Sequence, residues 1–200
     1  MRMLLVGSLA KAGELADEAG KPRDEEDLIR SAQRGEVSAF AELVKKYEDA
    51  VYSLLVRWLQ DRTAAEDVFQ QAMLAAYRGV GTYQLGTSFR SWLFRVAVNA
   101  AKDALRAEKR ETRRRTAWIE VADRAAHRND DGRLHAVAVL EHALTRVSDA
   151  DRLVLLLRFG EQLSNAEIGA MLGVPEFVVK MRVHRARARF RKVAGETEDE

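Results

Sequence analysis

Apolar residues recur at intervals of three and four along most of this chain, which is the spacing of an amphipathic helix. The longest such run predicts one helix from about Ser38 to Leu59. Its apolar positions fall on one face and are Phe40, Leu43, Val44, Tyr47, Val51, Leu54, Leu55 and Trp58. No segment sustains the alternation of apolar and polar residues that a half-buried strand requires. The pattern therefore predicts an all-α protein.

Side chains that can cap helices mark where several of these helices begin. Asp24 is positioned to cap a first helix, because its carboxylate can accept a hydrogen bond from a free backbone N–H. Thr63 and Glu66 have the spacing of a capping box and predict a third helix that ends near Gly79. Ser88 is predicted to cap a fourth helix. The inner face of that helix is expected to consist of Phe89, Trp92, Leu93, Val96, Ala100 and Ala104.

The helical pattern is interrupted after Arg106. The segment KRETRRR is basic, HRNDDGR is polar and rich in turn formers, and few bulky apolar residues lie between them. Because such a segment has little to bury, we predict a flexible linker between two small helical domains that move independently. The predicted plan is a mobile N-terminal extension at residues 1–23, a four-helix domain at 24–109, the linker at 110–133, a second helical domain at 134–194 and an acidic tail at 195–200.

The second domain ends in a predicted helix-turn-helix. Ser148 and Asp151 are expected to cap the helix before it, which ends at Gly160. The inner face of that helix is expected to hold Leu153, Val154, Leu157 and Phe159. The next 30 residues, 163–192, are LSNAEIGAMLGVPEFVVKMRVHRARARFRK and predict two short helices around a tight turn.

Local chemistry supports that prediction. Ser164 and Glu167 form a capping box, Gly173 permits the turn, and Pro175 suits the start of the next helix. Residues 176–192 contain seven cations and one acid, a net charge of +6. This is the pattern of a helix-turn-helix, whose second helix enters the major groove of DNA. A solvated amphipathic helix at the end of a domain is the alternative interpretation.

Composition narrows the possible functions. Lys and Arg number 33 and Asp and Glu 31, a net charge of +2, so the basic segments are local. Local basic segments suit nucleic-acid binding, because neutralising phosphates supplies much of the affinity. The chain has no cysteine and its four histidines form no ligand pattern, so neither a metal site nor a cofactor is expected. Without a membrane-length apolar run, a phosphate-binding loop or a nucleophile motif, we expect neither membrane insertion nor an enzyme.

Five segments in the two predicted domains carry a family resemblance. In the first domain they are DLIRSAQRGEVSAFAELVKKYEDAVYSLL, DRTAAEDVFQQAMLAAYRGV and FRSWLFRVAVNAAKDALR. In the second domain they are DRLVLLLRFGEQLSNAEIGAMLGV and VKMRVHRARARFRK. With these segments in this order, the chain resembles bacterial sigma factors of the sigma-70 family, in the compact extracytoplasmic-function (ECF) group.

The resemblance implies a dissociable promoter-recognition subunit of RNA polymerase, which acts in the cytoplasm on a stress- or signal-responsive set of genes. The first domain, resembling sigma region 2, would bind the clamp helices of the beta-prime subunit and open the −10 element. The second, resembling sigma region 4, would bind the −35 element. The implied partners are the RNA polymerase core, through its beta-prime clamp helices and beta flap, promoter DNA and an anti-sigma factor.

The resemblance also implies roles for individual residues. The polymerase-binding surface would be Asp67, Gln70 and Gln71, although Asp67 could instead serve only to stabilise the N-terminus of its own helix. The loop of residues 80–88 would form a pocket for an extruded base. The surface for the −10 element would be Arg90, Arg95, Asn99, Lys102 and Arg106. The surface for the −35 element would be Phe177, Val178, Lys180, Met181, Arg182, Arg185 and Arg189.

Three residues of the recognition helix depart from the family pattern, which places a Gly-Thr pair after the proline and a serine after the lysine. Here the corresponding residues are Phe177, Val178 and Met181. Large apolar side chains can contact thymine methyl groups or pack inward, and the sequence leaves both possibilities open. Trp92 lies on an apolar stripe and is predicted to be a core residue rather than a base-stacking one.

Two other classes of protein fit parts of the chain. A stand-alone helix-turn-helix regulator would explain residues 134–192 but not the first domain or the basic segment at 102–115. An all-helical interaction module would explain the helices, but the basic final helix argues against it.

Overall fold

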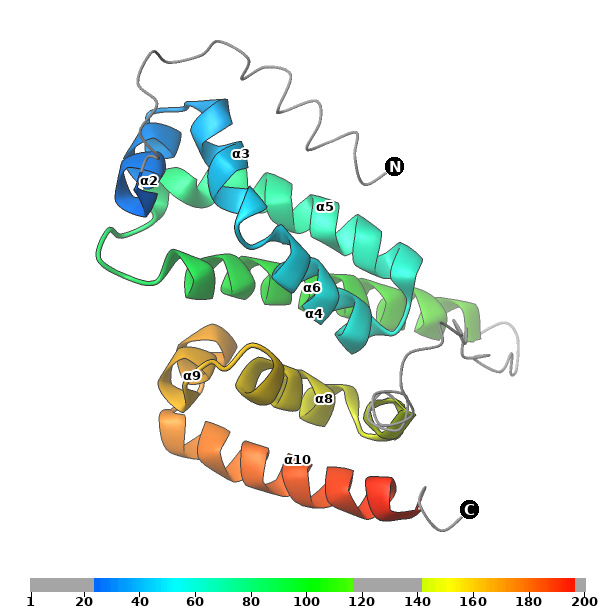
Figure 1. Ribbon diagram of the computed structural model, residues 1–200. Helices are drawn as coiled ribbons and strands as arrows, with labels where there is room; N and C mark the ends of the chain where they lie inside the picture. The colour runs from blue at the N-terminus through cyan, green and yellow to red at the C-terminus, as the bar shows by residue number, and fades with distance from the viewer. Residues whose placement is uncertain (1–23, 117–141, 197–200) are drawn as a thin grey trace.

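The computed structural model describes residues 24–116, here called the first domain, and residues 142–196, the second domain (Figure 1). Every regular element in these residues is helical, which confirms the predicted all-α fold. The first domain contains α2 (Glu25–Gln33), α3 (Val37–Lys45), α4 (Glu48–Leu59), α5 (Arg62–Gly79), the 3₁₀ turn η1 (Val80–Thr82) and α6 (Phe89–Thr116). The second domain contains a helical segment at 142–146, α8 (Asp149–Leu155), the π-helical turn η2 (Leu156–Gly160), α9 (Asn165–Leu172) and α10 (Glu176–Glu196).

The single long helix predicted from Ser38 to Leu59 is wrong, because the chain breaks between α3 and α4. The break lies at Lys46 and Tyr47, and Tyr47 precedes α4 with φ −125°. Both halves bury their apolar face in the same core, with Phe40 and Leu54 each almost completely buried. Apolar periodicity therefore continues across the bend, which is why the sequence alone does not reveal it.

The predicted capping box at the start of the third helix is also wrong. The helix α5 begins one residue after Asp61, whose side chain accepts a 3.0 Å hydrogen bond from the backbone N–H of Ala64. Thr63 lies exposed within the first turn, and Glu66 accepts a hydrogen bond from the Tyr52 hydroxyl instead. Asp61 and Thr63 are both good capping residues. The left-handed conformation of Gln60, which ends α4, favours Asp61 over Thr63 as the cap.

The fourth predicted helix, α6, buries more of its surface than expected. The hydroxyl of Ser88 accepts a hydrogen bond from the Ser91 N–H at 3.1 Å, which confirms the predicted cap. Phe89 and Leu93 are fully buried as predicted, whereas the other predicted inner residues are only partly buried. The buried residues that the prediction missed are Phe94, Ala97, Val98 and Ala101. The physical reason is that α6 packs against α4 and α5 and also against α9 of the second domain.

The helix α6 continues to Thr116, so the first residues of the predicted linker are helical. The rest of that linker, the N-terminal extension and residues 134–141 and 197–200 lie outside the described residues. The segment at 142–146 confirms helical structure at the start of the second domain, where Ala143 and Leu144 are buried. In Figure 1 the helices α8 and α9 lie between the first domain and α10, which forms the outermost layer of the second domain.

The helix of α8 and η2 is capped as predicted but turns differently at its end. The Ser148 hydroxyl accepts a 3.2 Å hydrogen bond from the Asp151 N–H, and Leu153, Val154 and Leu157 are buried. Phe159, predicted to be an inner residue, is 54% exposed. The π-helical turn carries more residues per turn than an α-helix and so rotates Phe159 away from the core.

The helix-turn-helix forms as the sequence predicts. The Ser164 N–H donates to the Glu167 carboxylate at 2.8 Å, and the Glu167 N–H donates to the Ser164 hydroxyl at 3.1 Å, which confirms the capping box. Gly173 ends α9 with φ 69°, a conformation that glycine adopts without strain. Gly169 allows the turn to approach, because a Cβ there would lie 2.7 Å from the Val174 carbonyl oxygen.

Candidate polymerase and nucleic-acid interfaces

The helix α5 separates a core face from a polar face. Val68, Ala72 and Ala76 are buried, as the sequence predicts. Asp67 and Gln71 are exposed and Gln70 is half-buried, so the structure brings the predicted polymerase-binding residues together on the outward side. Leu74 follows one turn after Gln70 and is 44% exposed, which gives this face an apolar contact beside its acid and amide groups. Such a mixed face suits a partner helix.

The predicted −10 surface follows α6. Arg95, Asn99 and Arg106 are exposed, and Arg106 forms a 3.0 Å ion pair with Asp103. Lys102 is half-buried, and burial holds the pKa of its ammonium group below its ordinary value. The positive charges of Arg106 and of Arg182, which belongs to the second domain, lower that pKa further.

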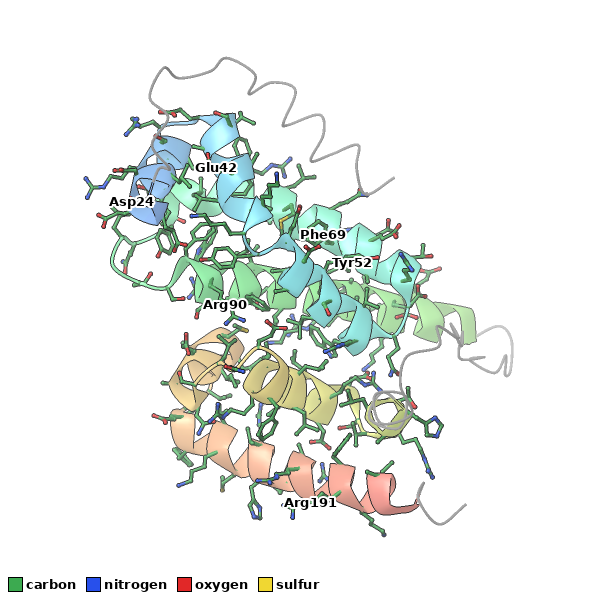
Figure 2. The ribbon with its side chains drawn as sticks, in the orientation of Figure 1. Asp24, Glu42, Tyr52, Phe69, Arg90 and Arg191 are labelled. Atoms are coloured by element: carbon green, nitrogen blue, oxygen red, sulfur yellow. The ribbon has the colours of Figure 1, made fainter. Side chains whose placement is uncertain are left out.

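Arg90, the first cation of this surface, is bound by the second domain. Its guanidinium donates hydrogen bonds to the Glu161 carboxylate at 2.8 Å and to the Glu161 backbone carbonyl at 3.0 Å. The same guanidinium lies over the Phe94 ring, 4.8 Å from its centroid. Beside it, the Ser91 hydroxyl donates to the carboxylate of Glu167. Figure 2 shows Arg90 at the beginning of α6, on the side that faces the second domain.

The loop that precedes α6 is anchored at one end and open at the other. Val80 and Tyr83 are buried, and the Gln33 side-chain amide donates to their backbone carbonyls at 3.2 and 2.8 Å. Residues 84–88 are exposed, including Leu85 at 40%. Trp92 is partly buried and its ring contacts those of Tyr83 and Phe89, so it packs against the core rather than within it. The exposed part of the loop is thus the part available to a ligand.

The recognition helix, α10, presents most of the predicted −35 residues to solvent. Lys180, Arg182 and Arg185 are exposed, as are Phe177 (63%) and Met181 (47%), while Val178 is half-buried. Arg189 is exposed as well, but its guanidinium also forms a 2.7 Å ion pair with the buried carboxylate of Asp151 on α8. Arg189 therefore helps to fix α10 on its own domain.

Comparison with known proteins identifies two sigma-factor regions, one in each domain. The protein-family model described as Sigma-70 region 2 matches residues 43–111, and the family model described as Sigma-70, region 4 matches residues 143–192. The ECF RNA polymerase sigma factor SigW of Bacillus subtilis is 30% identical over 174 residues, which cover 82% of this chain and 93% of that protein. The ECF RNA polymerase sigma factor SigM of Mycobacterium tuberculosis is 32% identical over 177 residues, 86% of each chain.

This chain belongs to the sigma-70 family, in its ECF group. It is a dissociable sigma subunit of RNA polymerase, from a family of transcription factors that are not enzymes. A stand-alone helix-turn-helix regulator does not account for the match to region 2.

Solved structures share the fold of this sigma factor. The sigma factor RpoE of Bartonella quintana, in complex with the anti-sigma factor NepR, has a TM-score of 0.66 at 22% identity and covers 77% of this chain and 95% of its own. CnrH in complex with the cytosolic domain of CnrY has a TM-score of 0.63 at 23% identity and covers 86% and 97%.

The contact between the two domains of the sigma factor contains a buried arginine that the sequence analysis missed. Arg152 on α8 is 4% exposed, and its guanidinium donates to the Trp58 carbonyl of the first domain at 2.9 Å. It also donates to three carbonyl oxygens of its own domain, those of Leu144 (2.7 Å), Thr145 (3.2 Å) and Val147 (3.2 Å). In the opposite direction, the Trp58 indole N–H donates to the Asp149 carbonyl at 3.1 Å. Burial lowers the pKa of Arg152, yet its acceptors keep the cation satisfied.

The two glutamates of this contact have opposite pKa shifts. Burial raises the pKa of Glu161, and the charges of Arg90 and Arg57 oppose that rise. The hydrogen bond from the Ser91 hydroxyl lowers the pKa of Glu167, helped by the backbone N–H of Ser164. Neither acid was a predicted site residue, since partners more than 70 residues away in sequence are not visible in local patterns.

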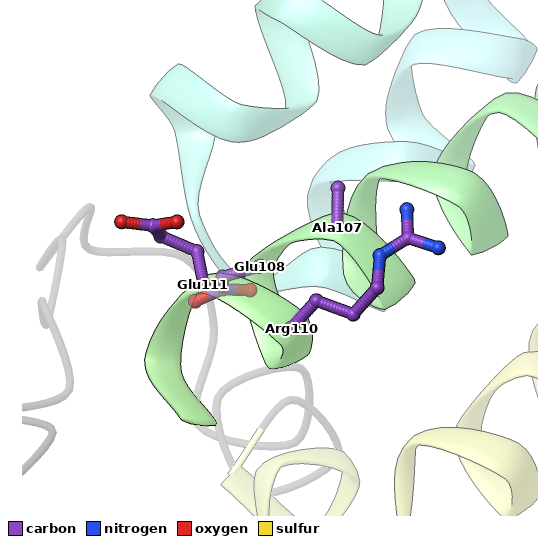
Figure 3. Close-up of a pocket in the computed structure, with 4 residues that line it drawn as sticks. All are labelled: Ala107, Glu108, Arg110 and Glu111. Atoms are coloured by element: carbon purple, nitrogen blue, oxygen red, sulfur yellow. The ribbon is translucent and has the colours of Figure 1, made fainter. Parts of the chain in front are cut away.

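A hollow near the end of α6 is lined by Ala107, Glu108, Arg110 and Glu111 (Figure 3), whose exposed side chains make it an open depression. Residues 24–116 and 142–196 contain no group of three acids or histidines that could hold a metal ion. In the same part of the chain, no helix has the length and apolar character needed to cross a bilayer.

Proposed function

We propose that this sigma factor binds the polymerase core through α5 and promoter DNA through α6 and α10. The observation that carries the proposal is that three distinct surfaces face outward from a shared core. They are the acid-amide face of α5, the cationic row of α6 and the basic face of α10. A single chain with these surfaces can join a protein partner to two separate DNA elements.

The −10 element would be bound as a single strand along α6. Arg95, Lys102 and Arg106 supply cations for successive phosphates, and Asn99 supplies an amide for a base edge. The exposed end of the loop at residues 84–88 is the place for an extruded base. Arg90 joins this surface after its bonds to Glu161 have broken.

The −35 element would be bound as a duplex by α10. Lys180, Arg182 and Arg185 are exposed in the first half of that helix, where helix-turn-helix proteins contact base edges. Further along, Arg187, Arg191 and Lys192 are exposed and suit phosphate contacts.

An anti-sigma factor that regulates this sigma subunit is part of the proposal, as is the beta flap as a contact of the second domain. The place of action is then the cytoplasm, where polymerase and promoter DNA are found. The chain carries out no chemical step itself, because the polymerase performs catalysis.

Run-off transcription with purified core polymerase tests the proposal. The full chain is expected to direct specific transcripts from a promoter library. Replacing Asp67, Gln70 and Gln71 together with alanine is expected to weaken binding to the core without unfolding the bundle. A matched control replaces three exposed polar residues in or directly after α3, namely Glu42, Lys45 and Lys46. Unchanged core affinity in the α5 variant would reject the assigned polymerase surface.

A further inference from the structure

Two large apolar side chains stand exposed, one turn apart, on the recognition helix. Phe177 is 63% exposed and Met181 is 47% exposed. Isolated exposed apolar residues are ordinary on protein surfaces, but here two of them adjoin on the helix that carries the basic face. The sequence alone is compatible with inward packing of Phe177 and Met181. Their exposure shows that they do not pack inward.

The buried side of α10 fixes where this pair points. Val179 and Ala186 are completely buried and lie seven residues apart, so they mark the inward line of the helix. Phe177 and Met181 each lie two residues from Val179, which is about 200° around the helix axis. Both side chains therefore point almost directly away from the second domain's core, where a bound ligand would lie.

The surroundings of the pair indicate a polyanionic partner. Lys180, Arg182 and Arg185 are exposed around it, and residues 177–194 contain no acid. A purely apolar partner would leave these cations without counter-charges, and phosphates alone would not cover the phenyl ring and the thioether. The major groove of duplex DNA offers both features, because it has phosphates along its edges and thymine methyl groups on its floor.

We infer that Phe177 and Met181 contact thymine methyl groups in the −35 element, so that its sequence contains thymines opposite the first turns of α10. The inference rests on the proposed function and specifies which bases the recognition helix selects. Lys180 and Arg185 lie on either side of the pair around the helix axis and would hold the helix to the flanking phosphates.

Uracil substitution isolates the methyl group, because deoxyuridine differs from thymidine only by its absence. The reconstituted holoenzyme first selects promoters from a random library. Each thymine of the selected −35 element is then replaced by deoxyuridine, and duplex affinity is measured for the unaltered chain. We expect about a fourfold loss of affinity for each methyl group that the pair contacts.

Variants assign the effect to the two side chains. In Phe177→Ala and Met181→Ala, the thymine duplex is expected to bind more weakly and the ratio between thymine and uracil duplexes to approach one. Both positions are exposed, so a thermal melt should show unaltered folding. The control Arg191→Ala changes an exposed cation of the same helix and should weaken both duplexes alike, leaving the ratio unchanged.

Three outcomes would overturn the inference. Equal affinity for thymine and uracil duplexes at every position would exclude methyl recognition. Variants that bind duplexes normally but lose core polymerase would place a protein on the pair. If the full chain directed no transcript at all, the proposed function would fail with the inference, whereas normal transcription with equal affinities would reject the inference alone.

Discussion

The two cationic surfaces of the molecule differ in how accessible they are. On α10, Lys180, Arg182 and Arg185 are exposed and the helix forms the outermost layer. At the start of α6, the guanidinium of Arg90 is bonded to Glu161, and its neighbour Ser91 is bonded to Glu167. The face proposed for duplex DNA is therefore open in this structure, whereas the face proposed for a single strand has Arg90 and Ser91 bonded to the second domain.

The difference in accessibility between the two cationic surfaces follows from where the acidic residues lie. The second domain places Glu161 and Glu167 on the side that faces α6, and it places no acid along residues 177–194 of its outer helix. The carboxylate of Glu161 thus occupies a position beside Arg90 that a DNA phosphate would otherwise take. In this way the second domain has an open cationic surface of its own and partly covers the cationic surface of the first domain.

Removing Arg152 should have the largest effect, because it breaks the contact between α8 and the Trp58 carbonyl at the end of α4. In Arg152→Ala, four carbonyl oxygens lose a charged donor, including that of Trp58. We expect the free energy of unfolding to fall by about 3 kcal/mol, measured by urea denaturation. The exposed Arg187 is the control, and Arg187→Ala should change that free energy by less than about 0.5 kcal/mol. Similar results for both variants would show that Arg152 does not hold the domains together.

Neutralising Glu161 should make the cationic surface of α6 more accessible and so closer in this respect to that of α10. In Glu161→Gln, Arg90 loses its anionic partner. We expect the free sigma factor to bind a −10 single strand about three- to fivefold more tightly, measured by filter binding. Glu42→Gln makes the same charge change at an exposed position on α3. If both variants gained affinity equally, net charge rather than the release of Arg90 would be the cause.

On α10, Arg189 and Arg191 should behave differently although both are arginines near the end of the same helix. Arg189→Ala leaves the buried Asp151 carboxylate without its 2.7 Å partner and should lower the free energy of unfolding by about 0.5–1 kcal/mol. Arg191→Ala should leave stability unchanged and reduce the slope of DNA affinity against salt concentration by about one. If Arg189→Ala instead lowered the salt slope and Arg191→Ala instead lowered stability, the ion pair between Arg189 and Asp151 would not persist in solution.

The smallest effect concerns the pKa of Glu167. Its folded-state pKa is lowered, first by the hydrogen bond from Ser91, so this carboxylate stabilises the fold above its ordinary pKa. That stability is lost as pH falls through the lowered folded-state value. Ser91→Ala should move the pKa of Glu167 back toward its ordinary value, as observed by NMR titration of the carboxyl carbon.

The control for this titration is Ser38→Ala, which changes an exposed serine on α3. Glu161 serves as a reference in the same spectra, because burial raises rather than lowers its pKa. An unchanged pKa of Glu167 in Ser91→Ala would show that Ser91 does not bond to it across the domains.

Features encoded by neighbouring residues could be predicted from the sequence. The caps at Ser148 and Ser164, the turn at Gly173 and the core face of α5 all depend on residues within about one helical turn of each other. The outward positions of Asp67 and Lys180 followed from the same periodicity.

Features that depend on tertiary packing could not be predicted from the sequence. The bend before α4 keeps one apolar face continuous, and the π-helical turn that exposes Phe159 alters the period itself. The bond between Arg90 and Glu161 joins residues 71 positions apart, so a cation predicted for DNA is also a contact between domains. Local patterns identify the residue types of a surface, but not which partner each residue has in the folded chain.

The placement of Trp58 gives the molecule a built-in optical probe of domain separation. Its indole ring is 4% exposed, and its N–H reaches the Asp149 carbonyl across the contact. An indole that exchanges such a partner for water emits at longer wavelength. The chain has three tryptophans, so replacing Trp92 and Trp118 with phenylalanine leaves Trp58 as the sole emitter. A red shift on addition of a DNA strand, which contains no tryptophan, would then report separation of the two domains in real time, without an attached dye.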